Sequence, residues 1–328
     1  MKENNIDYMQ VKAVSNSSLS FIEKNPKEFK KFIDGEYVEE KTNYYELGTA
    51  IHSAILEPKN YKEIYSFMDY AAPRSPNQKK FCELYSNNPT RKDNKLIEMY
   101  SECYSCKGLS EQKIIEEAKS VLKDNADYLK YLKKSQKGVI LSTSDEKMIS
   151  SILNSVKEHK KASNLLFNIY ADVIADDNIF AENEIEIYWE DKQKIPYKSK
   201  IDRLYIDFKH KVVQIIDLKT TAKIDEFEKS IENYNYDRQL AFYKIAVYNL
   251  FKQKFENQNL EEFTFEFFIV AVSKQDYRVK VYKVTESTIN SALNKIYSLL
   301  DRVKWHFEND KWDYYLEYYT NDGVIEIW

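Results

Sequence analysis

One short segment of the chain combines a carboxylate and an ammonium group in a pattern that could support catalysis. It runs from Ile215 to Thr220 and reads IIDLKT. Side chains two apart in a strand share a face, so we expect Asp217 and Lys219 on one face and Leu218 on the other. Charged side chains are uncommon on the buried side of a strand, which favours a functional site. A cross-strand ion pair on a solvated face is the alternative interpretation.

The preceding expected strand, YKSKIDRLYI, carries further charged residues with the same period of two. A hairpin through FKHK would bring Asp202 near Asp217, and two converging carboxylates repel each other unless a cation lies between them. Hard oxygen ligands favour Mg²⁺ or Mn²⁺. Lys219 could orient or deprotonate a water, or stabilise charge that develops on a phosphate. Lys198 and Lys200 could contact a phosphodiester backbone.

Two pairs of residues four apart lie on predicted helices. Gly48 and His52 share a face in the segment LGTAIH. Glycine costs about 1 kcal/mol in a helix interior, so its presence suggests that another group approaches this face closely. Gln239 and Tyr243 share a face of a downstream helix, above one point of the sheet. A structural histidine and the polar stripe of an amphipathic helix are the alternative interpretations of the two pairs.

The elements that position these residues change in character near residue 180. In the N-terminal half of the chain, the sequence pattern predicts helices at 15–34 (two short helices), 44–57, 110–135 and 142–169, with irregular or broken helix at 60–95. The second half predicts antiparallel strands at 184–189, 197–206 and 212–218, a helix at 226–256, strands at 263–272 and 277–284, and a helix at 286–308. The fold class is therefore α/β (α+β), a central mixed sheet flanked by helices with a large helical N-terminal half.

Composition excludes several classes of protein. The 328 residues include five dispersed glycines, which excludes a phosphate loop and a dinucleotide fingerprint. Four histidines and three cysteines argue against multi-histidine zinc sites and disulfide scaffolds, and Cys82, Cys103 and Cys106 are most simply free thiols. We expect a cytoplasmic protein, because no signal peptide or membrane-spanning apolar run is recognisable. A net charge of -4 argues against non-specific coating of nucleic acid but permits a local basic cleft.

In chain order, the motifs resemble the RecB-like branch of the PD-(D/E)XK nuclease superfamily. They are G-x-x-x-H (Gly48, His52), Asp202, D-x-K (Asp217, Lys219) and Q-x-x-x-Y (Gln239, Tyr243). Longer segments resemble the RecE-type (exonuclease VIII-like) phage and prophage exonucleases over about residues 15–285. These segments are SNSSLSFIEKNPKEF, ELGTAIHSAILEP, LSTSDEKMISSILNSVKEHKKASNLL and ENEIEIYW with YKSKIDRL. The resemblance implies the PD-(D/E)XK core fold.

The resemblance also implies roles for individual residues. His52, Asp202 and Asp217 correspond to ligands of the catalytic divalent metals, with the main-chain carbonyl of Leu218 as a further ligand. Lys219 corresponds to the lysine that activates the attacking water. Glu184 matches a glutamate near the site, with its neighbour Glu186 as an alternative. Gln239 and Tyr243 correspond to the helix that contacts the DNA strand or steadies the site, and Lys200 stands where the family often has arginine.

The activity that the resemblance implies is hydrolysis of linear double-stranded DNA. Digestion would run from 5′ to 3′, need two Mg²⁺ or Mn²⁺ ions, and leave 3′ single strands for an annealing protein in phage-type recombination. A homo-oligomer, a tetramer in this family, is a further expectation. No cysteine follows residue 106, so we expect no iron–sulfur cluster. The alternatives are an endonuclease or single-strand nuclease of a defence or repair system, and a non-catalytic DNA-binding protein on a nuclease fold.

We expect a single nuclease domain over residues 1–328. Within it, residues 1–59 would form N-terminal helices that include Gly48 and His52, and residues 60–170 a helical elaboration. Residues 171–310 would form the catalytic sheet with its flanking helices, and residues 311–328 a C-terminal tail.

Overall fold

The computed structural model describes residues 8–37, 43–167 and 178–324, with the side chains of residues 43–45 left aside. The chain divides into two compact units. Unit 1 comprises Met1–Glu57 and Ser151–Trp328, and unit 2 comprises Pro58–Ser150. The predicted helical elaboration at 60–170 therefore overlaps unit 2 and continues beyond it into unit 1. None of the described helices is both long enough and apolar enough to cross a membrane.

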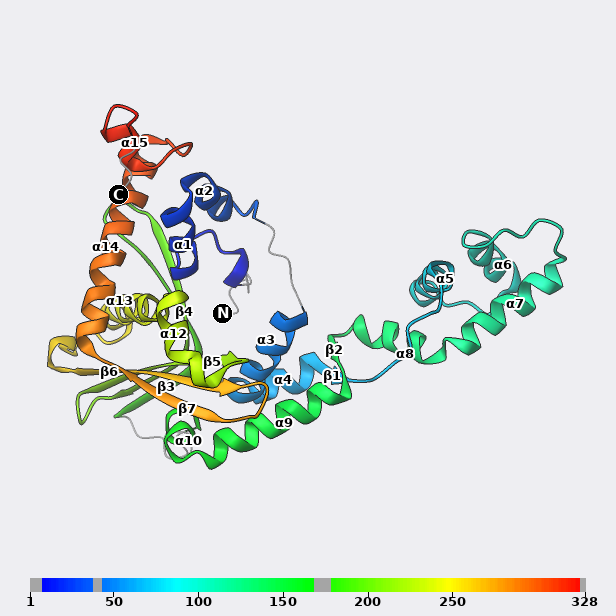
Figure 1. Ribbon diagram of the computed structural model, residues 1–328, viewed down its shortest axis with the longest axis horizontal. Coiled ribbons are helices and arrows are strands. Elements are labelled where there is room, and N and C mark those ends of the chain that lie inside the picture. Colours follow the sequence, from blue (N-terminus) through cyan, green and yellow to red (C-terminus); the bar gives the residue numbers. More distant parts are fainter. Residues whose placement is uncertain (1–7, 38–42, 168–177, 325–328) are drawn as a thin grey trace. The chain divides into compact units, whose positions relative to one another are not determined.

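Unit 1 is built on a five-stranded sheet with the order β3-β4-β5-β6-β7 (Figure 1). The strands are β3 (Ile179–Glu190), β4 (Pro196–Asp207), β5 (Val212–Thr221), β6 (Thr264–Ser273) and β7 (Val279–Val284). Neighbouring strands are antiparallel except for β5 and β6, which are parallel. This mixed α/β architecture confirms the predicted fold class.

The parallel pair β5 and β6 requires a crossover connection, because a hairpin can join only antiparallel strands. The crossover contains η2 (Ile224–Glu226), α12 (Phe227–Asn233), α13 (Tyr236–Lys254) and η3 (Leu260–Glu262). The single helix predicted at 226–256 is therefore interrupted. Asn235 has a φ of 53°, a left-handed conformation that separates α12 from α13.

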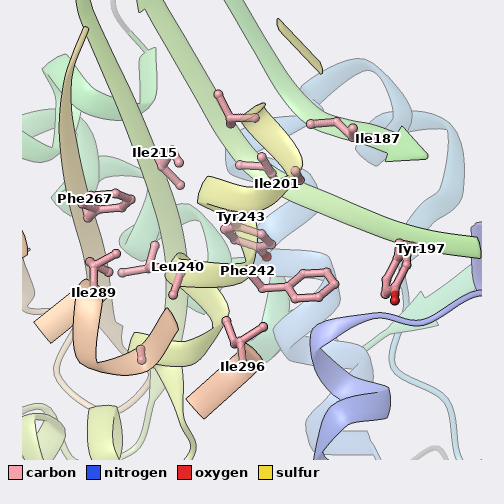
Figure 2. Close-up of a cluster of buried hydrophobic side chains, with 14 of the residues drawn as sticks. Ile187, Tyr197, Ile201, Ile215, Leu240, Phe242, Tyr243, Phe267, Ile289 and Ile296 are labelled. Atoms are coloured by element: carbon pink, nitrogen blue, oxygen red, sulfur yellow. The ribbon is translucent and has the colours of Figure 1, made fainter. Parts of the chain in front are cut away.

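Helices α13 and α14 (Glu286–Asn309) cover one face of the sheet. Leu240 of α13 and Ile289 of α14 pack with Ile215 and Phe267 of the sheet in the main hydrophobic core (Figure 2). Each fully buried side chain of this size stabilises the fold by about 1.5–3 kcal/mol. The core also includes residues of α1 (Asn16–Lys24) and α2 (Pro26–Asp34), the two helices predicted at 15–34.

Helix α3 (Asn43–Leu56) approaches the opposite face of β5. A Cβ atom added to Gly48 would lie 3.5 Å from Oγ1 of Thr220, an ordinary van der Waals contact, so the packing of helix on strand does not itself require glycine. Helix α10 (Lys160–Phe167) also lies on this face, where Lys161 Nζ is 4.6 Å from the ring centroid of Phe268. The remaining short elements of unit 1 are η1 (Tyr8–Gln10) and α15 (Leu316–Thr320).

Unit 2 is helical, with one small parallel two-stranded sheet. Its elements are α4 (Pro58–Ile64), β1 (Tyr65–Phe67), α5 (Pro76–Asn87), α6 (Asp93–Ser101), α7 (Glu111–Asp124), α8 (Ala126–Ser135) and β2 (Val139–Leu141). The irregular or broken helix expected at 60–95 corresponds to short helices separated by segments without helix, and α5 is one of these helices. Pro76 lies in the first turn of α5, where proline is tolerated, and Ser75 caps that turn. Helix α9 (Thr143–Glu158) begins in unit 2 and continues into unit 1.

Candidate metal and catalytic site

Strands β4 and β5 stop pairing immediately before the two aspartates. Their register runs from Asp207 opposite Val212 to Arg203 opposite Ile216. One further step would place Asp202 opposite Asp217, but that pair is absent from the register. Instead, Oδ2 of Asp202 accepts a hydrogen bond of 2.7 Å from the main-chain N–H of Leu218. A side-chain carboxylate thus takes the place of a main-chain acceptor where the ladder ends.

Strand β3 is interrupted at the same level. Its pairs with β4 include Asn183 with Arg203 and Ile185 with Ile201, while the intervening Glu184 is left out. Glu184 has a φ of 52°, which is unfavourable for a residue with a side chain and costs about 1–3 kcal/mol. The irregularities at residues 184, 202 and 217 therefore form one line across three neighbouring strands. Strain of this kind is typical of functional sites.

Three side chains from three elements converge on this line. One potential ligand atom each from His52 of α3, Glu184 of β3 and Asp202 of β4 lies within 4.8 Å of the others. Nδ1 of His52 is 3.8 Å from Oδ2 of Asp202. One imidazole nitrogen and two carboxylates form a donor set that could hold a divalent metal ion. The sequence placed Glu184 near the site, and the structure brings it into the group of candidate ligands itself.

Asp217 and Lys219 form a buried ion pair beside this group. Nζ of Lys219 donates a hydrogen bond of 2.7 Å to Oδ1 of Asp217 and lies 2.6 Å from Oδ2. Oδ2 is buried as well, and its ion pair with the ammonium offsets part of the cost of burying a charged oxygen. Nζ of Lys219 also lies 4.9 Å from the ring centroid of Tyr236, whose face favours a cation.

The pKa values of the carboxyl groups are raised, chiefly by burial. Burial, opposed by Lys219 and supported by repulsion from Asp202, raises the pKa of Asp217 to about 6. Burial likewise raises the pKa of Asp202, although Lys219 and the Leu218 amide lower it. The pKa of Glu184 is raised by burial and then by Asp202. A divalent cation would relieve this destabilisation, so the residues present fit a metal site.

His52 and Lys219 hold opposite protonation states at neutral pH. Burial, followed by the charge of Lys219, lowers the pKa of His52 to about 4, so its imidazole is neutral and can act as a metal ligand. Burial alone would lower the pKa of Lys219, but Asp217 and Asp202 outweigh that effect and the net pKa is raised. The lysine is therefore an ammonium, which can position an anionic group or stabilise developing negative charge.

Gln239 and Tyr243 join this site from α13. Nε2 of Gln239 donates a hydrogen bond of 2.7 Å to Oη of Tyr243. The pKa of Tyr243 is raised well above its usual value by burial and then by the charges of Asp202 and Asp217. Figure 2 shows Tyr243 pointing from α13 toward the strand that contains Ile201. The main chain of Leu218 lies at the site, since its N–H donates to Asp202, and its interaction with His52 offsets a small part of the lowering of the His52 pKa.

The two lysines expected to contact DNA are engaged within the protein. Lys198 is buried, and its Nζ donates to the main-chain carbonyls of Tyr8 at 2.8 Å and Val11 at 2.7 Å. This ammonium therefore anchors the N-terminal segment against β4. Nζ of Lys200 lies 2.9 Å from Oε2 of Glu184, which raises the pKa of the lysine despite its burial. Lys200 thus contacts the candidate ligand Glu184, whereas Lys198 contacts the N-terminal segment.

A polar connection between α3, β3 and β4 could not be predicted from the sequence. Nη1 of Arg203 donates to Oδ1 of Asn183 at 2.7 Å, and Nδ2 of Asn183 donates to the main-chain carbonyl of Leu56 at 2.7 Å. This connection joins the last residue of α3, the helix of His52, to the strands of Glu184 and Asp202. The only sequence signal was position, since Asn183 precedes Glu184 and Arg203 follows Asp202. Their partners are distant in the chain, so spacing could not reveal them.

An α/β sheet with Asp202 and a D-x-K motif on adjacent strands is the arrangement expected of the PD-(D/E)XK class of proteins. Residues 15–318 match the family described as "PDDEXK-like domain of unknown function (DUF3799)", and the chain belongs to this family. A search of the curated proteins finds no match.

Two solved structures are similar to this chain. The crystal structure of a "Putative exonuclease" from Eubacterium rectale aligns with 100% of this chain and 96% of that chain, at 11% identity and a TM-score of 0.46. The crystal structure of SSO0001 aligns with 47% of this chain and 68% of that chain, at 14% identity and a TM-score of 0.22. The family assignment rests on the family match and not on these two alignments.

Proposed function

We propose that this protein is a metal-dependent exonuclease that hydrolyses the phosphodiester bonds of linear double-stranded DNA. The observation that carries this proposal is the convergence of His52, Glu184 and Asp202 next to the buried pair of Asp217 and Lys219. A set of metal donors beside a positioned ammonium is the arrangement that phosphodiester hydrolysis needs. The family match supports the same class of chemistry.

The candidate ligands are the side chains of His52, Glu184, Asp202 and Asp217 and the main-chain carbonyl of Leu218. When bound there, Mg²⁺ or Mn²⁺, two ions in this proposal, would lower the pKa of a water and neutralise charge on the phosphate. The neutral imidazole of His52 offers a nitrogen lone pair without the loss of a proton. The carboxylate of Asp217, which is paired with Lys219, offers buried oxygen donors.

The remaining side chains orient groups within the site. The ammonium of Lys219, fixed by Asp217, would hold the attacking water or hydroxide and stabilise charge that develops on the phosphate. Lys200 neutralises part of the charge of Glu184 and holds its carboxylate in place. Gln239 and Tyr243 place a hydroxyl beside the carboxylates, where it would contact the DNA strand or steady the ligands.

The finer assignment follows the resemblance to RecE-type exonucleases. We propose 5′ to 3′ digestion that leaves 3′ single strands for an annealing protein in phage-type recombination. We further propose a cytoplasmic homo-oligomer, a tetramer by resemblance, in which units 1 and 2 belong to one nuclease domain.

The deciding experiment is digestion of linear duplex labelled at the 5′ or the 3′ end. Wild type should release the 5′ label first with Mg²⁺ and should be inactive with EDTA. Asp217→Ala should be inactive under both conditions, and Asp217→Asn, which preserves the shape of the side chain, should behave in the same way. Release of the 3′ label first would reverse the proposed polarity.

A closed circular duplex separates the alternatives. An exonuclease leaves it intact, whereas an endonuclease would nick it as fast as it shortens linear DNA. If wild type leaves linear and circular duplex and single strands intact with Mg²⁺ or Mn²⁺, hydrolysis is refuted. Binding of DNA without cleavage would then identify a non-catalytic protein on a nuclease fold.

A further inference from the structure

Unit 2 contains a groove lined by tyrosines. Its volume is about 320 Å³, and it lies between α5, α8 and the segment that precedes α5. Tyr70 and Tyr131 stack with their ring centroids 4.0 Å apart, and Tyr128 lies 5.7 Å from Tyr70. The remaining lining includes Ala72, Pro73, Lys79, Glu83, Leu132 and Ser135. The groove is therefore an aromatic surface with a few polar groups at its edge.

Two of these tyrosines, Tyr128 and Tyr70, differ in how much of the side chain is exposed. Tyr128 is 4% exposed, and its hydroxyl donates to Oε1 of Glu83 at 3.1 Å, so it is held as part of the wall. Tyr70 is 39% exposed although its ring is stacked on Tyr131. A large ring that is rigidly stacked and open to solvent loses little entropy when another planar group stacks on it.

The charge of unit 2 is opposite to that of unit 1. Residues 58–150 contain 17 lysines and arginines against 13 aspartates and glutamates, a formal charge of +4. The rest of the chain contains the remaining 32 basic and 40 acidic residues, which gives -8. A basic unit attracts polyanions over distances longer than a single contact. In the groove, the side chain of Lys79 is 62% exposed and 4.0 Å from Glu83, so its ammonium can reach a phosphate.

We propose that the tyrosine groove of unit 2 binds single-stranded DNA, with a base stacked on Tyr70 and a neighbouring phosphate at Lys79. Stacking on aromatic side chains combined with a positive field is how proteins bind single strands without regard to sequence. The groove holds about one nucleoside, and Glu83 and Ser135 offer polar contacts to a base edge. This inference is independent of the nuclease reaction, although a single strand is also the product proposed above.

The test is binding of a fluorescent oligo(dT) to the full chain in EDTA, where metal-dependent cleavage cannot occur. Tyr70→Ala should weaken binding about tenfold relative to wild type, while Tyr70→Phe, which keeps the ring, should bind within about twofold. Tyr248→Ala is the matched control, since Tyr248 is 38% exposed and stacked on Phe265 in unit 1. It should bind like wild type. Circular dichroism and thermal melts establish that each variant is folded.

The alternatives give distinct results. Equal binding by Tyr70→Ala and wild type would overturn the proposal. Failure of wild type to bind the oligonucleotide would also overturn it, and a peptide would then be the remaining candidate occupant of the groove. If Tyr70→Phe loses as much affinity as Tyr70→Ala, the hydroxyl and not the ring is responsible and stacking is refuted. An abasic oligonucleotide should bind as weakly to wild type as oligo(dT) binds to Tyr70→Ala.

A second measurement separates this inference from the proposed nuclease. Digestion of linear duplex with Mg²⁺ is followed for the same proteins. Loss of oligo(dT) binding in Tyr70→Ala, with no digestion by wild type, would support the groove and refute the nuclease. Digestion by wild type together with unchanged binding by Tyr70→Ala would do the reverse.

Discussion

The two units of this protein place their charges in opposite ways. Unit 1 has a formal charge of -8 and buries several of its ionisable groups at one level of the sheet, where Asp202, Asp217 and Lys219 lie close together. Unit 2 has a formal charge of +4, contains no histidine, and presents stacked tyrosines and exposed lysines. The acidic unit thus contains the candidate metal donors, and the basic unit contains the tyrosine groove. The net charge of -4 conceals this division.

The largest expected effect is loss of digestion without loss of oligo(dT) binding. Such a result would assign the two functions to different units. Asp217→Ala and Asp217→Asn should reduce digestion of linear duplex by about 10³-fold, because both remove a candidate metal ligand and the carboxylate that fixes the Lys219 ammonium. Both should bind oligo(dT) in EDTA like wild type. Asp301→Asn, at a carboxylate that is 75% exposed, is the control and should digest normally. Parallel loss of binding and digestion would show that the two functions are not divided between the units.

The next effect concerns the affinity for metal. His52→Ala removes one neutral donor and should raise the Mg²⁺ concentration needed for half-maximal digestion by about 10–100-fold, by analogy with losses of groups around metal sites. Because excess metal compensates for a lost ligand, activity should recover in part at high Mg²⁺. His210→Ala is the control, since His210 is exposed and pairs with Asp207 in the β4–β5 turn. An unchanged Mg²⁺ requirement in His52→Ala would remove this histidine from the site.

Metal should also stabilise the fold of unit 1. At about a hundredfold excess over its dissociation constant, a bound ion contributes about 2.7 kcal/mol. We therefore expect Mn²⁺ or Mg²⁺ to raise the Tm by about 5–11 °C relative to EDTA in differential scanning fluorimetry, since each kcal/mol shifts the Tm of a domain of this size by about 2–4 °C. Asp202→Asn should abolish this shift, whereas Tyr70→Ala should retain it. A metal-dependent shift that survives in Asp202→Asn would place the cation elsewhere.

The smallest effect comes from the polar connection between α3, β3 and β4. Asn183→Ala removes the bonds to Arg203 and Leu56 and should lower the free energy of unfolding by about 1–3 kcal/mol. It should also raise the Mg²⁺ requirement by a few fold, because α3 then holds His52 less firmly. Asn249→Ala, which removes a bond to the Ile245 carbonyl within α13, is the control for stability alone. Urea unfolding and Mg²⁺ titration of digestion measure the two effects separately.

The sequence predicted those parts of the site that depend on strand periodicity and on adjacent strands. Asp217 and Lys219 share a face because they are two apart, and the hairpin brings Asp202 to the same level as Asp217. These relations need no knowledge of the rest of the fold. The large elements of unit 1 were predicted for the same reason, since their apolar periodicity is long and regular.

The remaining features depend on contacts between distant residues. Lys198 and Lys200 have the same spacing and charge, yet Lys198 binds main-chain carbonyls while Lys200 binds Glu184. The left-handed conformation of Glu184 has no glycine or asparagine to signal it. The groove of unit 2 joins Tyr70 to Tyr131 across 61 positions in the sequence, so no local pattern could predict it.

The line of interrupted pairing across β3, β4 and β5 also determines how the chain can change in length during evolution. Residues 184, 202 and 217 lie side by side because the β3–β4 register and the β4–β5 register both place them at the same position along the strands. Insertion of one residue within a strand would turn every later side chain to the opposite face. The turns between these strands, at 191–195 and 208–211, lie outside the registers and can lengthen without moving the site. Variation in length among related chains should therefore concentrate in these turns and spare the strands themselves.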